Sequence, residues 1–218
     1  MTIAEQENEL FAEWQSVVEG FVADGIVDEL RYAESSPKLV FVLKEVHDTT
    51  DGGGWDLRKE LTKPDRWQTW NVVTRWVKAI QNLPHETHWE ELAEVEASDR
   101  KHHLASIVAM NLKKSPGGAS SLADDISKFA NDHADRLRQQ FDLYNPDFVV
   151  CCGTAIPFAR SVFKGVPREW GFTSRGMKYW EYDRGKYILD FYHPQARYPA
   201  AFLHFGLVDA VSELWKNR

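Results

Sequence analysis

Three short polar segments of this chain carry side chains whose chemistry is complementary. In chain order they read KEVHD (44–48), MNLKKSPGG (110–118) and YHPQAR (192–197). Glu45 supplies a carboxylate for acid–base or electrostatic work, and His193 an imidazole that can donate a proton near neutral pH. Asn111 supplies an amide with both a donor and an acceptor for reading the edge of a ligand. These groups can act together only if the fold places the three segments side by side.

The elements around these segments predict such a fold. Short apolar runs predict buried strands, and segments with three- and four-residue apolar spacing predict helices between them. The expected strands are 37–43, 104–112, 147–153 and 186–194. The expected helices are 3–24, 66–82 with Asp65 as its N-cap, a short one at 89–97, 121–143, 154–165 and 199–216. The alternation predicts an α/β fold of three αβα layers around a central, mostly parallel four-stranded sheet.

Ligands of such sheets bind beyond the carboxyl ends of the strands. The segments 44–58, 111–119 and 193–198 each follow one of the expected strands. We therefore expect Glu45, Asn111 and His193 to meet at one edge of the sheet.

Length and composition favour a single domain over residues 1–218, with an N-terminal helix within 1–30 packing on it. The chain has 218 residues, of which 43% are hydrophobic and 27% charged, enough to bury a core. The net charge of −7 lacks the basic footprint of most nucleic-acid binders, so any DNA-binding face must be local. The acidic N-terminus does not resemble a signal peptide, and we expect a cytoplasmic monomer without a membrane segment.

The order and strand context of the motifs resemble the uracil-DNA glycosylase superfamily over about residues 37–215. KEVHD occupies the place of that superfamily's GEAPG or GQDPYH motif, with Glu45 at the acidic position. AMNLKKSPGG is similar to the strand end TN-x-VKCRPPGN of thermophile-type members, with Asn111 at the base-reading position. VVCCGTAIPFAR resembles a strand ending in LG before a helix, and FYHPQAR resembles the closing YHP or HPS motif.

The resemblance implies a monofunctional DNA glycosylase that leaves an abasic site, acting in repair or in defence against modified foreign DNA. Its partner would be DNA that contains a damaged or modified base, flipped into the pocket. Glu45 would stabilise the sugar cation and orient water, with Asp48 either sharing the water-activating task or forming a hydrogen bond to His47. His193 would donate to the departing base, as an oxyanion hole does. Without the resemblance, Glu45 is interpreted as a solvated loop acid or a partner of Lys44, and His193 as a structural residue of a tight turn.

Further positions acquire binding roles from the same resemblance. Asn111, His47 and Trp55 would contact the base, with Trp55 otherwise a packing residue. The DNA backbone would be contacted by Lys113, Lys114, Ser115, Gly117, Gln195 and Arg197, through charges and backbone N–H groups. Otherwise, 113–117 is a solvated turn and Arg197 an ordinary surface residue.

The chain departs from the superfamily in ways that affect substrate choice. Val46 replaces a proline of the water-binding loop, and His47 stands where a tyrosine excludes the methyl group of thymine. The iron–sulfur cysteines are absent, so no cofactor is expected, and the adjacent Cys151 and Cys152 are expected to be packed thiols. Two other functions stay open: a module that binds modified DNA without cutting it, and a hydrolase of free nucleosides or nucleotides.

Overall fold

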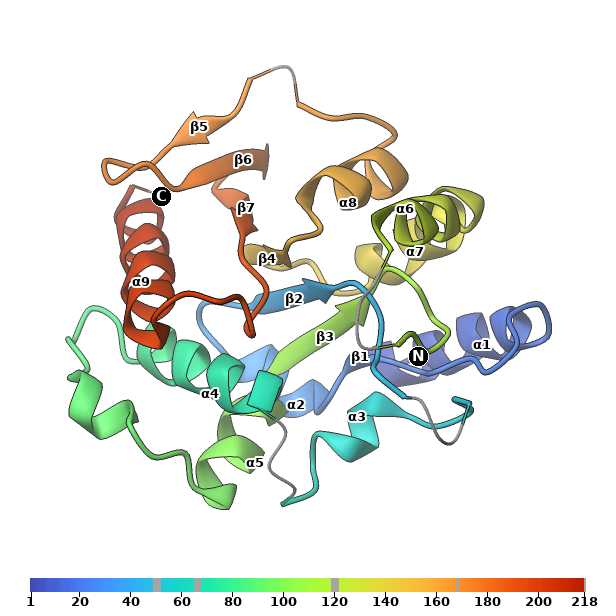
Figure 1. Ribbon diagram of the computed structural model, residues 1–218, viewed down its shortest axis with the longest axis horizontal. Helices are drawn as coiled ribbons and strands as arrows, with labels where there is room; N and C mark the ends of the chain where they lie inside the picture. The colour runs from blue at the N-terminus through green and yellow to red at the C-terminus, as the bar shows by residue number, and fades with distance from the viewer. Residues whose placement is uncertain (49–51, 65–67, 119–121, 168, 218) are drawn as a thin grey trace.

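A computed structural model describes residues 1–48, 52–64, 68–118, 122–167 and 169–217. One sheet runs through it in the strand order β1-β3-β2-β4-β7-β6-β5 (Figure 1). Its strands are β1 (Gly25–Ile26), β2 (Leu39–Leu43), β3 (Ile107–Asn111), β4 (Phe148–Cys152), β5 (Gly171–Phe172), β6 (Lys178–Asp183) and β7 (Lys186–Phe191).

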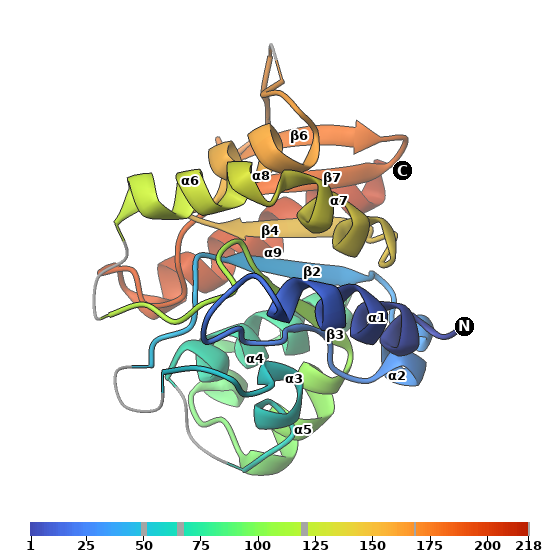
Figure 2. The same ribbon diagram turned by 90° about the vertical axis from the view of Figure 1, so that its right-hand side faces the viewer.

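Helices cover both faces of this sheet, because its strands are apolar on both sides. Alternate residues of β2 point in opposite directions: Phe41 packs into one hydrophobic cluster and Val40 and Val42 into the other. The first face carries α4 (Gln68–Gln81), α5 (Ala97–Ala105) and α9 (Ala200–Lys216). The second carries α1 (Ile3–Gln15), α6 (Ala123–Asp132), α7 (Ala134–Asp142) and α8 (Ala155–Val162) (Figure 2). The shorter elements are α2 (Glu29–Glu34), α3 (Leu57–Glu60) and the 3-10 helix η1 (Trp89–Leu92).

The α/β class is confirmed, but the prediction of a four-stranded sheet is wrong. The four expected strands are the inner ones, β3, β2, β4 and β7, and each pairs in parallel with its neighbour. Three further strands, β1, β5 and β6, add antiparallel pairs at the two edges. Their sequences gave no strand signal because β1 and β5 have two residues each, and β6 is polar and only partly buried.

Several helix boundaries also differ from the predictions. The segment expected to form one helix at 121–143 forms α6 and α7, which are separated at His133. The His133 ring accepts a hydrogen bond from Trp14 Nε1 at 3.1 Å, a contact with α1 that local periodicity does not register. α1 ends at Gln15 rather than near residue 24, and residues 104–105 end α5 rather than begin a strand. The expected N-cap Asp65 lies outside the described residues.

The strand register brings the polar segments to one edge of the sheet. Leu43 at the end of β2 is paired with Asn111 at the end of β3, and Cys152 of β4 is paired with Phe191 of β7. Figure 2 shows the connections after β2, β3 and β7 on the left, at the carboxyl ends of these strands. Within the described ranges, every helix is too short or too polar to span a bilayer.

Candidate functional site

A cavity of ≈ 540 Å³ lies at this edge of the sheet. Its volume is within the range of about 300–1,000 Å³ that is typical of small-molecule sites. Five of the predicted site residues line it: Glu45, His47, Asn111, His193 and Gln195. The remaining lining residues are Leu43, Val46, Leu57, Gln68, Thr69, Trp70 and Gly118. Residues from three separate strand ends therefore converge on one hollow that is large enough to admit a nucleobase.

The carboxylate of Glu45 is held on two sides. Lys113 Nζ lies 2.6 Å from Glu45 Oε2, and both side chains are largely shielded from solvent. Gly117 packs so closely that a Cβ atom there would lie 2.0 Å from the carboxylate carbon. The Gly117 N–H donates to the carbonyl of Val46 at 2.9 Å, which joins the first and second segments. Glycine at 117 is thus required by the position of Glu45, and its N–H is already used within the protein.

Asn111 ends β3 with its side chain at the cavity wall. Its backbone N–H donates to Asp24 Oδ2 at 2.8 Å, which fixes the main chain at this point. No residue of the described ranges hydrogen-bonds to its side-chain amide. This amide is therefore available to pair with a polar edge of a bound molecule.

His193 is held as a neutral imidazole with a defined tautomer. Its Nδ1 accepts the backbone N–H of Gln195 at 3.2 Å, so the ring proton resides on Nε2. Burial, with a smaller effect of the Lys44 charge, lowers the pKa of His193 below its usual value of 6.5. The ring is thus a neutral hydrogen-bond donor at pH 7. The Gln195 side chain donates to Thr69 Oγ1 at 2.6 Å and ties this turn to the start of α4.

Asp48 and Trp55 lie together but do not line the cavity. Trp55 Nε1 donates to Asp48 Oδ2 at 2.8 Å, and the Gly53 N–H reaches the same oxygen at 3.3 Å. The Trp55 ring packs partly buried against the core cluster beside α4. Asp48 and Trp55, which were expected to share the catalytic task and to stack on the base, are thus not part of the cavity lining. His47, in contrast, is exposed and lines the cavity.

The residues expected to contact the DNA backbone are separated by the fold. Lys113 pairs with Glu45, whereas Lys114 is fully buried and lies 2.6 Å from Asp24 Oδ1. Burial excludes the Lys114 ammonium from contact with a phosphate, which corrects the expectation from its place in a polar turn. Ser115 lines a separate, open depression together with Val18 and His133. Arg197 is exposed and outside the cavity lining.

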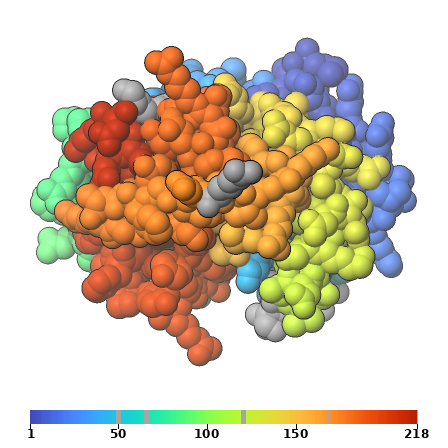
Figure 3. Space-filling model, turned by 90° about the horizontal axis from the view of Figure 1, so that it is seen from above, coloured from blue at the N-terminus to red at the C-terminus, as the bar shows by residue number. Residues whose placement is uncertain are grey.

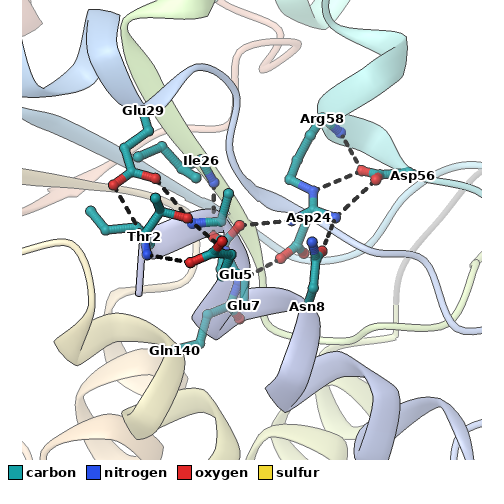
Figure 4. A network of polar contacts seen from close by, with 12 residues as sticks. Thr2, Glu5, Glu7, Asn8, Asp24, Ile26, Glu29, Asp56, Arg58 and Gln140 are labelled. Atoms are coloured by element: carbon teal, nitrogen blue, oxygen red, sulfur yellow. Dashed lines mark hydrogen bonds and ion pairs between the residues drawn. The ribbon is translucent and has the colours of Figure 1, made fainter.

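Lys114 belongs to a buried polar network behind the cavity, part of which is shown in Figure 4. Asp24 accepts hydrogen bonds from Lys114, from Gln140 Nε2 at 2.8 Å and from the Asn111 backbone. Gln140 Nε2 also reaches the Tyr144 hydroxyl at 2.8 Å, which donates to Glu7 Oε1 at 2.5 Å. The network therefore extends from the end of β3 across α7 to α1.

Burial shifts the pKa values of charged groups in this network, against the opposing effect of their charged partners. Glu7 Oε2 is paired with Arg58 Nη1 at 2.8 Å, yet burial raises the pKa of Glu7 to about 7. Burial also lowers the pKa of Lys114, against the opposing effect of Asp24. Such groups are stable in an interior only when each is hydrogen-bonded. The network is thus a structural element that supports the strand end carrying Asn111.

Sequence reasoning missed most of this network. Glu7 was detectable, because it is an acid on the apolar stripe of α1 that also carries Phe11 and Trp14. Asp24 gave no local signal, since it lies in a short connection before β1. Gln68, Thr69 and Trp70 were expected in a helix, but nothing indicated that the start of this helix closes the cavity.

The two cysteines are buried thiols, as expected. Cys151 and Cys152 are both free and inaccessible, and burial raises the pKa of each. Among the described residues, no three His, Cys, Asp or Glu side chains are grouped so that they could hold a metal ion.

Comparison with known proteins adds no relative: no protein-family model matches the chain, and a search of curated proteins finds no match. The candidate site is therefore interpreted from its own geometry.

Proposed function

We propose that this protein is a DNA glycosylase of the uracil-DNA glycosylase type, which hydrolyses the N-glycosidic bond of a flipped pyrimidine and leaves an abasic site. The observation that carries the proposal is the convergence of Glu45, Asn111 and His193 on one cavity of ≈ 540 Å³. The three residues come from three strand ends and offer a carboxylate, an amide and a neutral imidazole.

Each group suits one part of the reaction. As the glycosidic bond breaks, positive charge develops on the sugar and negative charge on the departing base. The Glu45 carboxylate would stabilise the sugar cation and orient the water that adds to C1′. His193 Nε2–H would donate to the base oxygen on which negative charge develops, and Asn111 would pair with the base edge. The departing base finally takes up a proton released by the water.

The substrate class we propose is a uracil-like or modified pyrimidine. His47 lies exposed at the cavity wall, where the resembled family carries a tyrosine that restricts the base. An exposed imidazole at this position leaves room for a substituent on C5 or provides a polar contact with it. A repair role and a role in defence against modified foreign DNA both fit this substrate class.

A hydrolase of free nucleosides or nucleotides is the second candidate function. One observation favours it: Lys113 and Lys114, two of the expected phosphate contacts, are both paired with carboxylates inside the protein. The net charge of −7 points the same way. This enzyme would use the same cavity without any DNA-binding face.

A cleavage assay tests both candidates. Labelled oligonucleotides that carry uracil, hypoxanthine or a substituted cytosine are incubated with the protein and then treated with alkali, and the matching nucleosides are followed by chromatography. We expect strand breaks at the modified base, and a loss of rate of about 10²- to 10⁴-fold in Glu45→Gln. Glu94→Gln, an exposed acid outside the cavity, is the matched control. Cleavage of nucleosides alone would select the second candidate, and no cleavage of any substrate would refute both.

A further inference from the structure

Exposed aromatic side chains lie on the connection from β7 to α9 and in the first turn of α9. Tyr192 is 50% exposed, Tyr198 56% and Phe202 78%. We refer to these three residues as the aromatic shelf. Large apolar groups exposed in this number on one short segment indicate a contact surface.

The shelf begins one residue away from the cavity. His193 and Gln195, which lie between Tyr192 and Tyr198 in the sequence, both line the cavity wall. The rings of Tyr192 and Tyr198 lie 4.9 Å apart between centroids, inclined at 57°. In Figure 3 the red-orange part of the chain, which precedes α9, projects from the surface at the lower edge. A strand with one base in the cavity would therefore carry its next base past these rings.

Phe205 does not belong to the shelf although it is partly exposed. The centroid of its ring lies 6.2 Å from that of Trp89 and 5.1 Å from that of His204, so neighbouring side chains already pack against it. The shelf is thus confined to the start of α9 and the turn before it.

The charge of this segment favours a polyanion. No aspartate or glutamate occurs between Asp190 and Asp209, although the whole chain has 33 acidic residues. Arg197 lies exposed within the segment, next to Tyr198. A protein with a net charge of −7 thus has an acid-free, aromatic stretch that includes two residues of its cavity wall, His193 and Gln195.

We propose that the aromatic shelf stacks the bases next to the reacting nucleotide, and that the substrate is therefore single-stranded DNA. The inference deepens the proposed glycosylase function and rests on it. An aromatic ring stacks on a base only when one face of that base is free, as it is in an unpaired strand. In a duplex, flipping one nucleotide frees only the face that each neighbouring base turned toward it, so the further rings of the shelf would find no free base to stack on.

A binding experiment that does not depend on turnover tests this inference. The probe is a fluorescent oligodeoxynucleotide with one tetrahydrofuran abasic-site analogue, used as a single strand and as a duplex, and binding is followed by anisotropy. We expect the single strand to bind more tightly. Tyr198→Ala and Phe202→Ala should weaken single-strand binding by about 5- to 150-fold, the factor for one stacked base, and leave duplex binding unchanged.

The matched control is Phe172→Ala, which removes a 64% exposed aromatic side chain on the edge strand β5. This variant should bind like the wild type. Tighter binding of the duplex, or unchanged affinity in the shelf variants, would overturn the inference while leaving glycosylase activity intact. A wild-type dimer in sedimentation velocity that the shelf variants dissociate would also overturn it, because a second copy of the chain would then occupy the shelf. Absence of base cleavage in the oligonucleotide assay would instead count against the proposed function.

Discussion

Lys113 and Lys114 are neighbours in the sequence, yet they serve different regions of the molecule. Each ammonium lies 2.6 Å from a carboxylate oxygen, Lys113 from Glu45 and Lys114 from Asp24. The first pair borders the open cavity and retains some contact with solvent. The second pair is fully buried in the network behind it. The two ion pairs have the same N–O distance but differ in desolvation cost, because only the buried pair has lost its hydration entirely.

We therefore assign Lys113 to the candidate active site and Lys114 to the stability of the fold. The Lys113 side chain is still 20% exposed and has lost its hydration only in part, so we expect this pair to be significant mainly for the orientation and charge of Glu45. A buried ion pair is costly to break, because removal of one partner leaves the other as an uncompensated charge. Four predictions test this division, from the largest expected effect to the smallest.

The largest effect is expected from Lys114→Met. This substitution leaves the Asp24 carboxylate buried without its cation, so we expect a loss of about 3–5 kcal/mol in the free energy of unfolding. Urea denaturation followed by fluorescence measures it. The double variant Asp24→Asn/Lys114→Met removes both charges and should recover most of the loss. If the single variant is as stable as the wild type, the buried pair has no structural role.

A second effect concerns the pH dependence of stability in the buried network. The pKa of Glu7 is raised from 4.5 to about 7, so the folded state holds a proton that the unfolded state releases above pH 4.5. The contribution of Glu7 to stability is therefore full below pH 4.5 and is lost as the pH rises to about 7, by roughly 3 kcal/mol. Glu7→Gln should flatten this part of the stability profile. An unchanged slope between pH 5 and 7.5 in urea titrations would contradict the assignment.

Loss of the lysine in the Lys113–Glu45 pair at the cavity should lower activity more than stability. In Lys113→Met the Glu45 carboxylate loses its cation and its orientation, and we expect kcat to fall about 10- to 100-fold in the glycosylase assay. The loss in the free energy of unfolding should be smaller than in Lys114→Met, because the Lys113 side chain keeps part of its hydration. Lys113→Arg should restore part of the rate. A large loss of stability with unchanged kcat would reverse the comparison.

The smallest effect is expected at the link between the third segment and α4. Gln195→Ala removes the hydrogen bond to Thr69 Oγ1, worth about 0.5–1.5 kcal/mol, but keeps the backbone N–H that orients His193. We expect KM to rise about two- to tenfold with kcat retained. Thr69→Val should have the same effect, and the double variant should add nothing further. Additive losses would show that the two side chains act separately.

The strands that carry the candidate site were predictable because each is a short, buried apolar run followed by polar residues. For this reason Glu45, Asn111, His193, His47 and Gln195 could be expected near one another, and they line one cavity. The edge strands β1, β5 and β6 were not predictable, because they are too short or too polar to stand out. The interruption between α6 and α7 falls at His133, whose ring contacts Trp14, a residue far away in the sequence.

The sequence by itself determined the α/β class, the inner strands and the edge of the sheet at which polar groups collect. These properties follow from local periodicity and from the rule that parallel strands present their carboxyl ends on one side. Only the tertiary structure decided that Lys113 is directed to Glu45 and Lys114 to Asp24, and that Asp48 turns to Trp55. The partner of a charged side chain is determined by residues from distant parts of the chain and by the solvent that they exclude, and neither is encoded in the neighbouring sequence.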